Sequence, residues 1–171
     1  MPRTTLTTAF LRGAFAQETG VCPVFLVTIT HPGLDAPIYV SSDPTQRLDD
    51  SSPTDIVYGT ISRGTEYVFY PFTLTLPSDE DEGPGNMVLQ IDNVRRQLTA
   101  TIRSIVGPPT ITTEIVLSES PDDVEATWPD FLLVNVSVDA STIQGTLMLE
   151  TLVREPFPGL SFTPGYFPAL F

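Results

Sequence analysis

The side chains that most often act in enzymes are scarce in this sequence. It has one histidine, His31, and one cysteine, Cys22, among 171 residues. A hydrolytic triad would need His31 near a nucleophile, but His31 precedes Pro32 in turn-forming sequence and no G-x-S-x-G motif is present. Cys22 stands before an apolar segment, where we expect a small buried side chain. The sequence therefore predicts no enzyme, no catalytic residue and no cofactor.

Carboxylates are the one reactive group present in abundance. Oxygen ligands for calcium could come from a run of four acids, Asp79, Glu80, Asp81 and Glu82. The run lacks the spaced ligands of an EF-hand loop, so we expect a solvated acidic loop and no metal. A carboxylate pair for glycoside hydrolysis would need aromatic platforms for the sugar, and Trp128 is the single tryptophan.

The balance of charge argues against two classes of partner. The chain has 21 acidic residues and eight basic ones, all arginine, for a net charge of −13. Binding to nucleic acid and to anionic membranes both need a cationic surface. No apolar run approaches the roughly 18–20 residues that cross a bilayer. The segment 1–20 lacks the continuous apolar stretch of a signal peptide, so we expect synthesis in the cytoplasm.

Alternating apolar and polar residues predict a chain built mainly of short strands. In the first of them, Phe25, Val27 and Ile29 share one face. Seventeen prolines argue against long helical bundles. Many short strands usually hide their edges by closing into a sandwich or a barrel. The expected strands are 24–30, 38–40, 56–61, 66–76, 87–91, 111–117, 131–138 and 143–153.

Turn-forming residues divide these strands. Arg63-Gly64 predicts a hairpin turn, and the clearest hairpin joins the last two strands at residues 139–141. We expect polar surface loops at 41–55, 78–85 and 118–123. In the segment 131–138, alternation predicts that four residues point inward: Leu132, Val134, Val136 and Val138.

Two helices are expected to flank the sheet. The first spans 4–17, with Thr4 or Thr5 as its cap and Leu6, Phe10 and Ala14 on one face.

The second predicted helix runs from about residue 93 to 105 after a cap at Asp92 or Asn93, and braces the sheet. Its other faces carry three arginines, which are either solvent-exposed or contacts to another subunit: Arg95, Arg96 and Arg103.

The segment 155–171 differs in kind from the domain predicted at 1–154. Four prolines make it a poor central strand or helix, and its aromatic content is too high for a disordered tail. We predict an extended arm that packs on its own domain or on a neighbouring subunit. The aromatic side chains available for this contact are Phe157, Phe162, Tyr166, Phe167 and Phe171.

Several motifs together resemble a known family. The central ones are YPFTLTLPSDEDEG at 70–83 and LQIDNVRRQL at 89–98. The C-terminal ones are EPFP at 155–158, FTP at 162–164 and FPALF at 167–171, where Ala169 replaces a usual glycine. With these motifs the sequence resembles, over nearly its whole length, the DUF1833 family of tailed-phage tail proteins.

This resemblance implies a structural minor tail protein at the distal end of the virion tail. It implies a tail-tube-like β-sandwich or barrel that forms a sixfold or threefold ring, continues the tube and joins it to the hub and baseplate. The implied partners are further copies of the chain and the tail tube, tape-measure and hub proteins, with DNA only passing through the lumen. The alternatives are a receptor- or carbohydrate-binding module, with exposed aromatics near Trp128 or Tyr166, and a tail-associated hydrolase.

Overall fold

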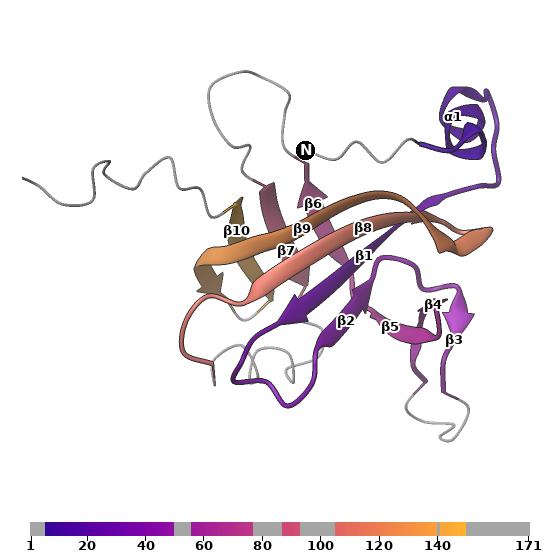
Figure 1. Cartoon of the computed structure of the whole chain (residues 1–171). Coiled ribbons are helices and arrows are strands. Elements are labelled where there is room, and N and C mark those ends of the chain that lie inside the picture. The colour runs from indigo at the N-terminus through magenta and orange to yellow at the C-terminus, as the bar shows by residue number, and fades with distance from the viewer. Residues whose placement is uncertain (1–5, 50–55, 77–86, 93–104, 140, 150–171) are drawn as a thin grey trace, which may run out of the picture.

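A computed structural model describes residues 6–49, 56–76, 87–92, 105–139 and 141–149 (Figure 1). These residues form a single helix and ten strands, so the prediction of a mainly β protein is confirmed. The elements are α1 (Thr8–Phe15), β1 (Pro23–Thr30), β2 (Ile38–Ser41), β3 (Gln46–Arg47), β4 (Tyr58–Ser62), β5 (Thr65–Phe69), β6 (Phe72–Thr75), β7 (Met87–Asp92), β8 (Thr110–Leu117), β9 (Ser120–Val138) and β10 (Thr142–Leu149).

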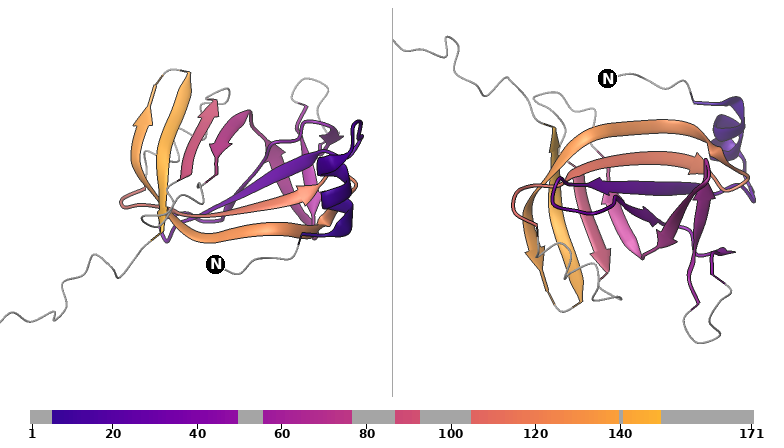
Figure 2. Two further views of the ribbon diagram at one scale, coloured as in Figure 1. Left: turned by 90° about the horizontal axis from the view of Figure 1, so that it is seen from above. Right: turned by 60° about the horizontal axis from the view of Figure 1, so that its bottom comes forward.

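All ten strands belong to one open, mixed sheet. Their order is β3-β4-β5-β2-β1-β8-β9-β10-β7-β6, so β3 and β6 form its two edges. Every pairing is antiparallel except that of β2 with β5. Strand β9 pairs with β8 along its first part and with β10 along its second. Figure 2 shows the result: β10, β7, β6 and the end of β9 stand at a steep angle to the layer of β1, β8 and the first part of β9.

The main hydrophobic core lies on the inner, concave face of the curved sheet. It draws buried side chains from both parts of the sheet, such as Val27 on β1 and Leu89 on β7. Half-buried residues of β6 pack against the same core. The remaining buried members are Ile29, Val40, Met87, Ile91, Ile111, Phe131, Leu133, Ile143 and Leu147. The edge strand β6 is therefore held by packing as well as by its ladder to β7.

Strand β1 buries side chains on both of its faces. Val27 and Ile29, which share a face as predicted, enter the main core, whereas Val24 and Leu26 point to the opposite face. There they join a second, smaller core with Tyr67 of β5. The sequence pattern alone did not predict this second core, because it depends on the hairpin β4–β5 covering the other face of β1.

The hairpin β4–β5 has the predicted turn. Arg63 and Gly64 both have positive φ angles, 50° and 76°, as the twist of a two-residue hairpin requires. The tip of the hairpin is tied to β8 and β9. Ser62 Oγ donates to the Pro121 carbonyl at 2.6 Å, and the guanidinium of Arg63 pairs with both carboxylate oxygens of Glu114. This hydrogen bonding to Glu114 raises the pKa of Arg63.

Two predictions on β8 and β9 were wrong. Residues 118–123 are not a loop, since β9 already begins at Ser120, which pairs with Leu117. In the segment 131–138 the residues buried in the main core are Phe131 and Leu133, and Val136 is 38% exposed. The predicted inward set therefore had the wrong parity at Leu132, Val134 and Val136, whereas Val138 packs against the main core as predicted.

Two of the register shifts along β9 lie beside or within the segment 131–138 and disrupt the regular alternation there. One inserts an extra residue between the pairs of Trp128 and Phe131, where Asp130 has a φ of 59°. The other lies between the pairs of Val134 and Ser137, where Asn135 has a φ of 53°. Since one extra residue turns every following side chain to the other face, a parity read from sequence fails beyond a bulge.

The other strands follow the prediction with shifted bounds. The expected strand 66–76 is divided into β5 and β6 at Tyr70-Pro71, and the expected loop 41–55 contains the short strand β3. The final hairpin, β9–β10, forms as predicted, with the Asp139 N–H donating to the Thr142 carbonyl at 2.8 Å. The predicted helix after Asp92, the acidic loop and the C-terminal arm lie outside the described residues.

Candidate interaction surfaces

The residues predicted to contact other subunits all lie outside the described part of the chain, and they stay predictions. They are the acids Asp79, Glu80, Asp81 and Glu82, the arginines Arg95, Arg96 and Arg103, and the aromatics Phe157, Phe162, Tyr166, Phe167 and Phe171. The division between 1–154 and 155–171 falls in the same undescribed region. The described part of the chain presents other candidate surfaces.

The residues considered for chemistry have structural positions. His31 Nδ1 accepts a hydrogen bond from the Gly33 N–H at 2.9 Å, which closes the turn after β1. Cys22 is exposed, so the expectation of a buried thiol was wrong. Its main-chain N–H and carbonyl both bond Ser118, and the side chain is left facing solvent.

Among the described residues, no three histidine, cysteine or acidic side chains come together as metal ligands would. The single helix described is too short to cross a membrane.

A buried carboxylate anchors helix α1 to the domain. Glu125 on β9 is 1% exposed, and its carboxylate accepts hydrogen bonds from the N–H of Thr7, at 2.7 Å, and from the Thr7 hydroxyl. The same hydroxyl accepts from the Phe10 N–H at 3.2 Å, which makes Thr7 the N-cap. The helix therefore begins at Thr8, four residues later than predicted, and its cap Thr7 meets Glu125. Nothing in the local sequence distinguishes this acid from its exposed neighbours.

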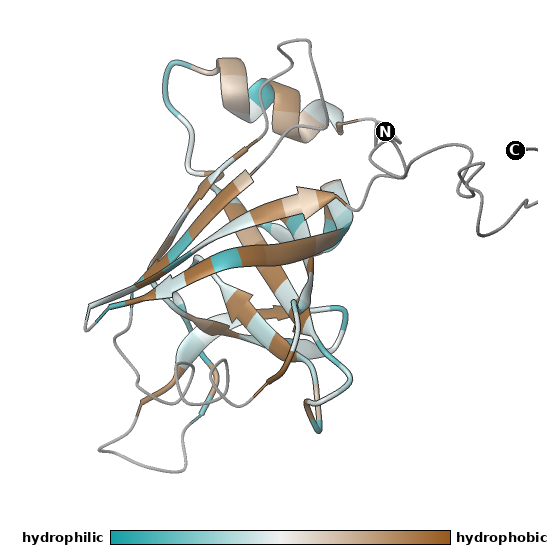
Figure 3. Cartoon of the chain, turned by 90° about the vertical axis from the view of Figure 1, so that its left-hand side faces the viewer, coloured by the Kyte–Doolittle hydropathy of each residue, from teal (hydrophilic) through white to brown (hydrophobic). Residues whose placement is uncertain are grey.

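Apart from this anchor, helix α1 packs lightly against the domain. None of its residues is buried, and Phe10 and Gly13 are the half-buried ones. Of the side chains predicted to share a buried face, Leu6 is 40% exposed and Ala14 is also exposed. Figure 1 shows α1 beyond one end of the sheet, and Figure 3 shows its strongly apolar segments.

The exposed side of α1 is apolar. Leu11 is 41% exposed and Phe15 is 87% exposed. Four residues apart on a helix, the two side chains are neighbours and form one ridge. Arg12 follows Leu11 in the last helical turn, where a cation is favoured by the helix dipole. The ridge is therefore an apolar surface beside a positive charge.

The charge of the chain is divided unevenly around this helix. Residues 1–17 contain two arginines and no acid, whereas residues 18–171 contain six arginines and 21 acids. The helix thus belongs to a basic segment attached to a strongly acidic body. This contrast can be read from the sequence, but only the structure shows that the basic segment carries an exposed apolar ridge.

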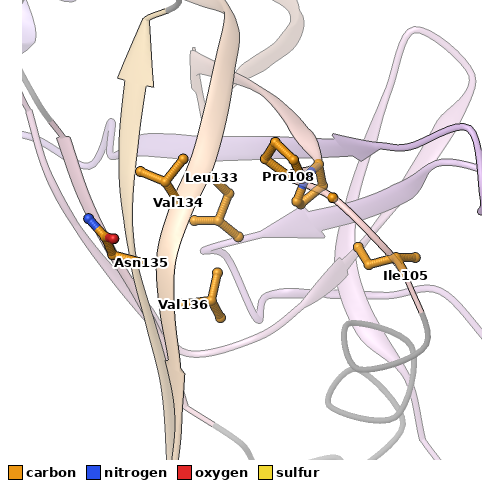
Figure 4. Close-up of a pocket in the computed structure, with 8 residues that line it drawn as sticks. Ile105, Pro108, Leu133, Val134, Asn135 and Val136 are labelled. Atoms are coloured by element: carbon orange, nitrogen blue, oxygen red, sulfur yellow. The ribbon is translucent and has the colours of Figure 1, made fainter.

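An apolar pocket lies at the other end of β8 and β9. Its volume is about 370 Å³, and Asn135 is the one polar residue of its lining (Figure 4). The lining residues are Ile105, Gly107, Pro108, Pro109, Leu133, Val134, Asn135 and Val136. Thr110 pairs with Leu132 at this end of the strands, whereas α1 leads into Cys22 beside the β8–β9 turn at the opposite end.

These features define a mainly β domain on one open sheet, with an anchored helix at one end and an apolar pocket at the other. The chain belongs to the DUF1833 family, described as a domain of unknown function, whose sequence model matches residues 10–162. No curated protein matches the sequence. The family match covers every strand described above and most of α1.

Proposed function

We propose that this protein is a structural component of the distal end of a phage tail, where several copies form a ring. The ring continues the tail tube and joins it to the hub and baseplate, next to the tape-measure protein. The chain acts as a building block in this role, with no catalytic activity and no cofactor. It is made in the host cytoplasm and then incorporated into the virion.

The observation that carries this proposal is the exposed apolar ridge of helix α1. The ridge is presented on a helix whose cap is bonded to the buried carboxylate of Glu125. Apolar surface held in a fixed position is typical of a protein–protein contact. The motifs at 70–98 and 155–171, which resemble tail proteins, support the tail as the place of assembly.

In the proposed ring, the curved sheet of each copy serves as the tail-tube-like sandwich or barrel that forms the wall of the tube. The acidic run 79–82 and the arm 155–171 contact neighbouring subunits. The guanidinium groups of Arg95, Arg96 and Arg103 pair with acidic loops, since their planar fork matches a carboxylate. The net charge of −13 per copy repels the DNA that passes through the lumen.

The alternative of a carbohydrate-binding module receives less support. It requires an exposed aromatic platform, and Trp128 was the candidate within the domain. Trp128 is half-buried and packs against the main core, which leaves less of its ring for a sugar, and Tyr166, the other candidate, lies outside the described residues.

Deleting the gene from a phage that carries it tests the proposal. We expect particles without a completed tail end, seen by electron microscopy, and their rescue by the wild-type gene supplied in trans. Particles with complete tails that fail only to adsorb to cells would overturn the ring and favour the receptor-binding alternative.

A further inference from the structure

The described part of the domain leaves the apolar ridge of helix α1 uncovered. It has eight residues, and isolated helices of fewer than about 12–15 residues are marginal in water. Most helical stability in proteins comes from packing of an apolar face. Here the ridge of Leu11 and Phe15 points away from the domain, and no residue of the helix is buried.

The apolar pocket between residues 105–109 and the end of β9 matches this ridge in chemistry and size. Apart from Asn135, its lining is apolar. Its volume of about 370 Å³ lies within the range of roughly 300–1,000 Å³ of pockets that hold organic ligands. Leu11 and Phe15, as adjacent anchors on one helix face, have the pattern of a helix that docks in a groove.

The helix cannot reach the pocket of its own chain. The two surfaces lie at opposite ends of β8, which has eight residues and therefore spans roughly 25 Å. Thr7 is bonded to Glu125 at one of these ends, so the helix is held away from the pocket. Within the described residues, the ridge and the pocket of one chain therefore cannot cover each other.

Charge identifies a second copy of this chain as the occupant. The segment that carries the ridge has two arginines and no acid, while the body that carries the pocket has an excess of 15 acids over arginines. Opposite charges on the two partners favour their encounter. We propose that the Leu11–Phe15 ridge of one copy docks in the pocket of the next copy.

This contact joins two different surfaces, so it is head-to-tail. A pair of copies then keeps one free ridge and one free pocket, and repetition gives a closed ring or an open filament. The inference deepens the proposed function and rests on it for ring closure. Its test uses the purified chain, so the docking can fail while the tail location holds, and the reverse.

Two substitutions separate the two halves of the contact. Phe15→Glu removes the ridge and leaves the pocket, whereas Val136→Glu places a charge at the pocket and leaves the ridge. Both side chains are exposed, at 87% and 38%, so both variants are expected to fold. Tyr58→Glu is the matched control, because Tyr58 is 42% exposed and belongs to neither surface.

Sedimentation velocity over a range of concentrations measures the association. Loss of a central anchor commonly costs 2 kcal/mol or more, so each variant alone should associate at least about 30-fold more weakly than the wild type or the control. An equal mixture of the two variants should form dimers and nothing larger, since one intact ridge meets one intact pocket. A monomeric wild type, or a mixture that behaves like its separate components, would overturn the proposal.

A photo-crosslinking amino acid at position 15 gives a second readout. With isotopically labelled and unlabelled chains mixed, we expect crosslinks between the two kinds of chain that map to residues 105–109 or 133–136. The docking would be refuted by crosslinks within one chain, including those to 155–171. It would also be refuted by crosslinks to any other part of the second copy.

Discussion

The anchor between Thr7 and Glu125 makes a prediction that tests how helix α1 is held. Thr7→Ala removes the hydroxyl that donates to the carboxylate and accepts from the Phe10 N–H, while the main-chain bond from residue 7 to Glu125 remains. Thr7→Ser retains both hydroxyl bonds. The two variants therefore isolate the contribution of one hydroxyl group.

The expected magnitude follows from the burial of Glu125. A hydrogen bond to a charged group contributes about 1.5–3 kcal/mol, and loss of an N-cap costs about 1 kcal/mol. The two effects overlap, because one hydroxyl makes both bonds. With Glu125 only 1% exposed, water replaces the lost donor poorly. We expect Thr7→Ala to lower the free energy of unfolding by about 2–3 kcal/mol, and Thr7→Ser by less than about 0.5 kcal/mol.

Urea denaturation measures these differences as shifts in midpoint at constant slope. Amide hydrogen exchange gives a local readout, in which Thr7→Ala should reduce protection in the last helical turn and leave β1 less affected. If Thr7→Ala unfolds within about 0.5 kcal/mol of the wild type, or if Thr7→Ser is as destabilised as Thr7→Ala, the anchor does not stabilise the helix as argued.

Three further predictions concern the domain itself. A Cβ at Gly59 would overlap a main-chain carbonyl oxygen of β5, whereas one at Gly20 would meet nothing. In thermal unfolding, Gly59→Ala should therefore lower the free energy of unfolding by about 3 kcal/mol or more, and Gly20→Ala should hardly change it. Equal effects of the two substitutions would contradict the β4–β5 pairing. Leu147 is fully buried, so Leu147→Ala should lower the free energy of unfolding in urea by about 2–5 kcal/mol. Val106 is 93% exposed, so Val106→Ala should change this free energy little. A Leu147→Ala variant as stable as the wild type would contradict the position of Leu147 in the core. Cys22 is exposed, so Ellman's reagent should modify one thiol per native chain without denaturant, and protection until unfolding would contradict its position.

The alternation of apolar residues was enough to predict most strands, because side chains on opposite faces of a strand have different surroundings. It placed Val27 and Ile29 on one face of β1, and both of these residues lie in the main core. It failed at Leu133 and Val136, because two bulges in β9 depend on pairing with β8 and β10 and have no clear local signature. It also missed the burial of Leu26, which a distant hairpin covers.

The interaction surfaces were predictable only in part. The uneven charge between residues 1–17 and the remaining chain is a property of the sequence. The role of Glu125 was not predictable, because an acid in a polar segment is normally exposed and only the approach of Thr7 stabilises its burial. The pocket was missed because it joins residues 105–109 to a distant part of β9.

The most direct test of the proposed function is the position and copy number of this chain in purified phage particles. A small tag on the chain, detected by gold labelling, gives the position by electron microscopy, and quantitative mass spectrometry against the major tube protein gives the copy number. The proposed ring predicts label at the distal end of each tail, with three or six copies per particle. Absence of the chain from mature particles, or label along the whole tail, would contradict the proposal.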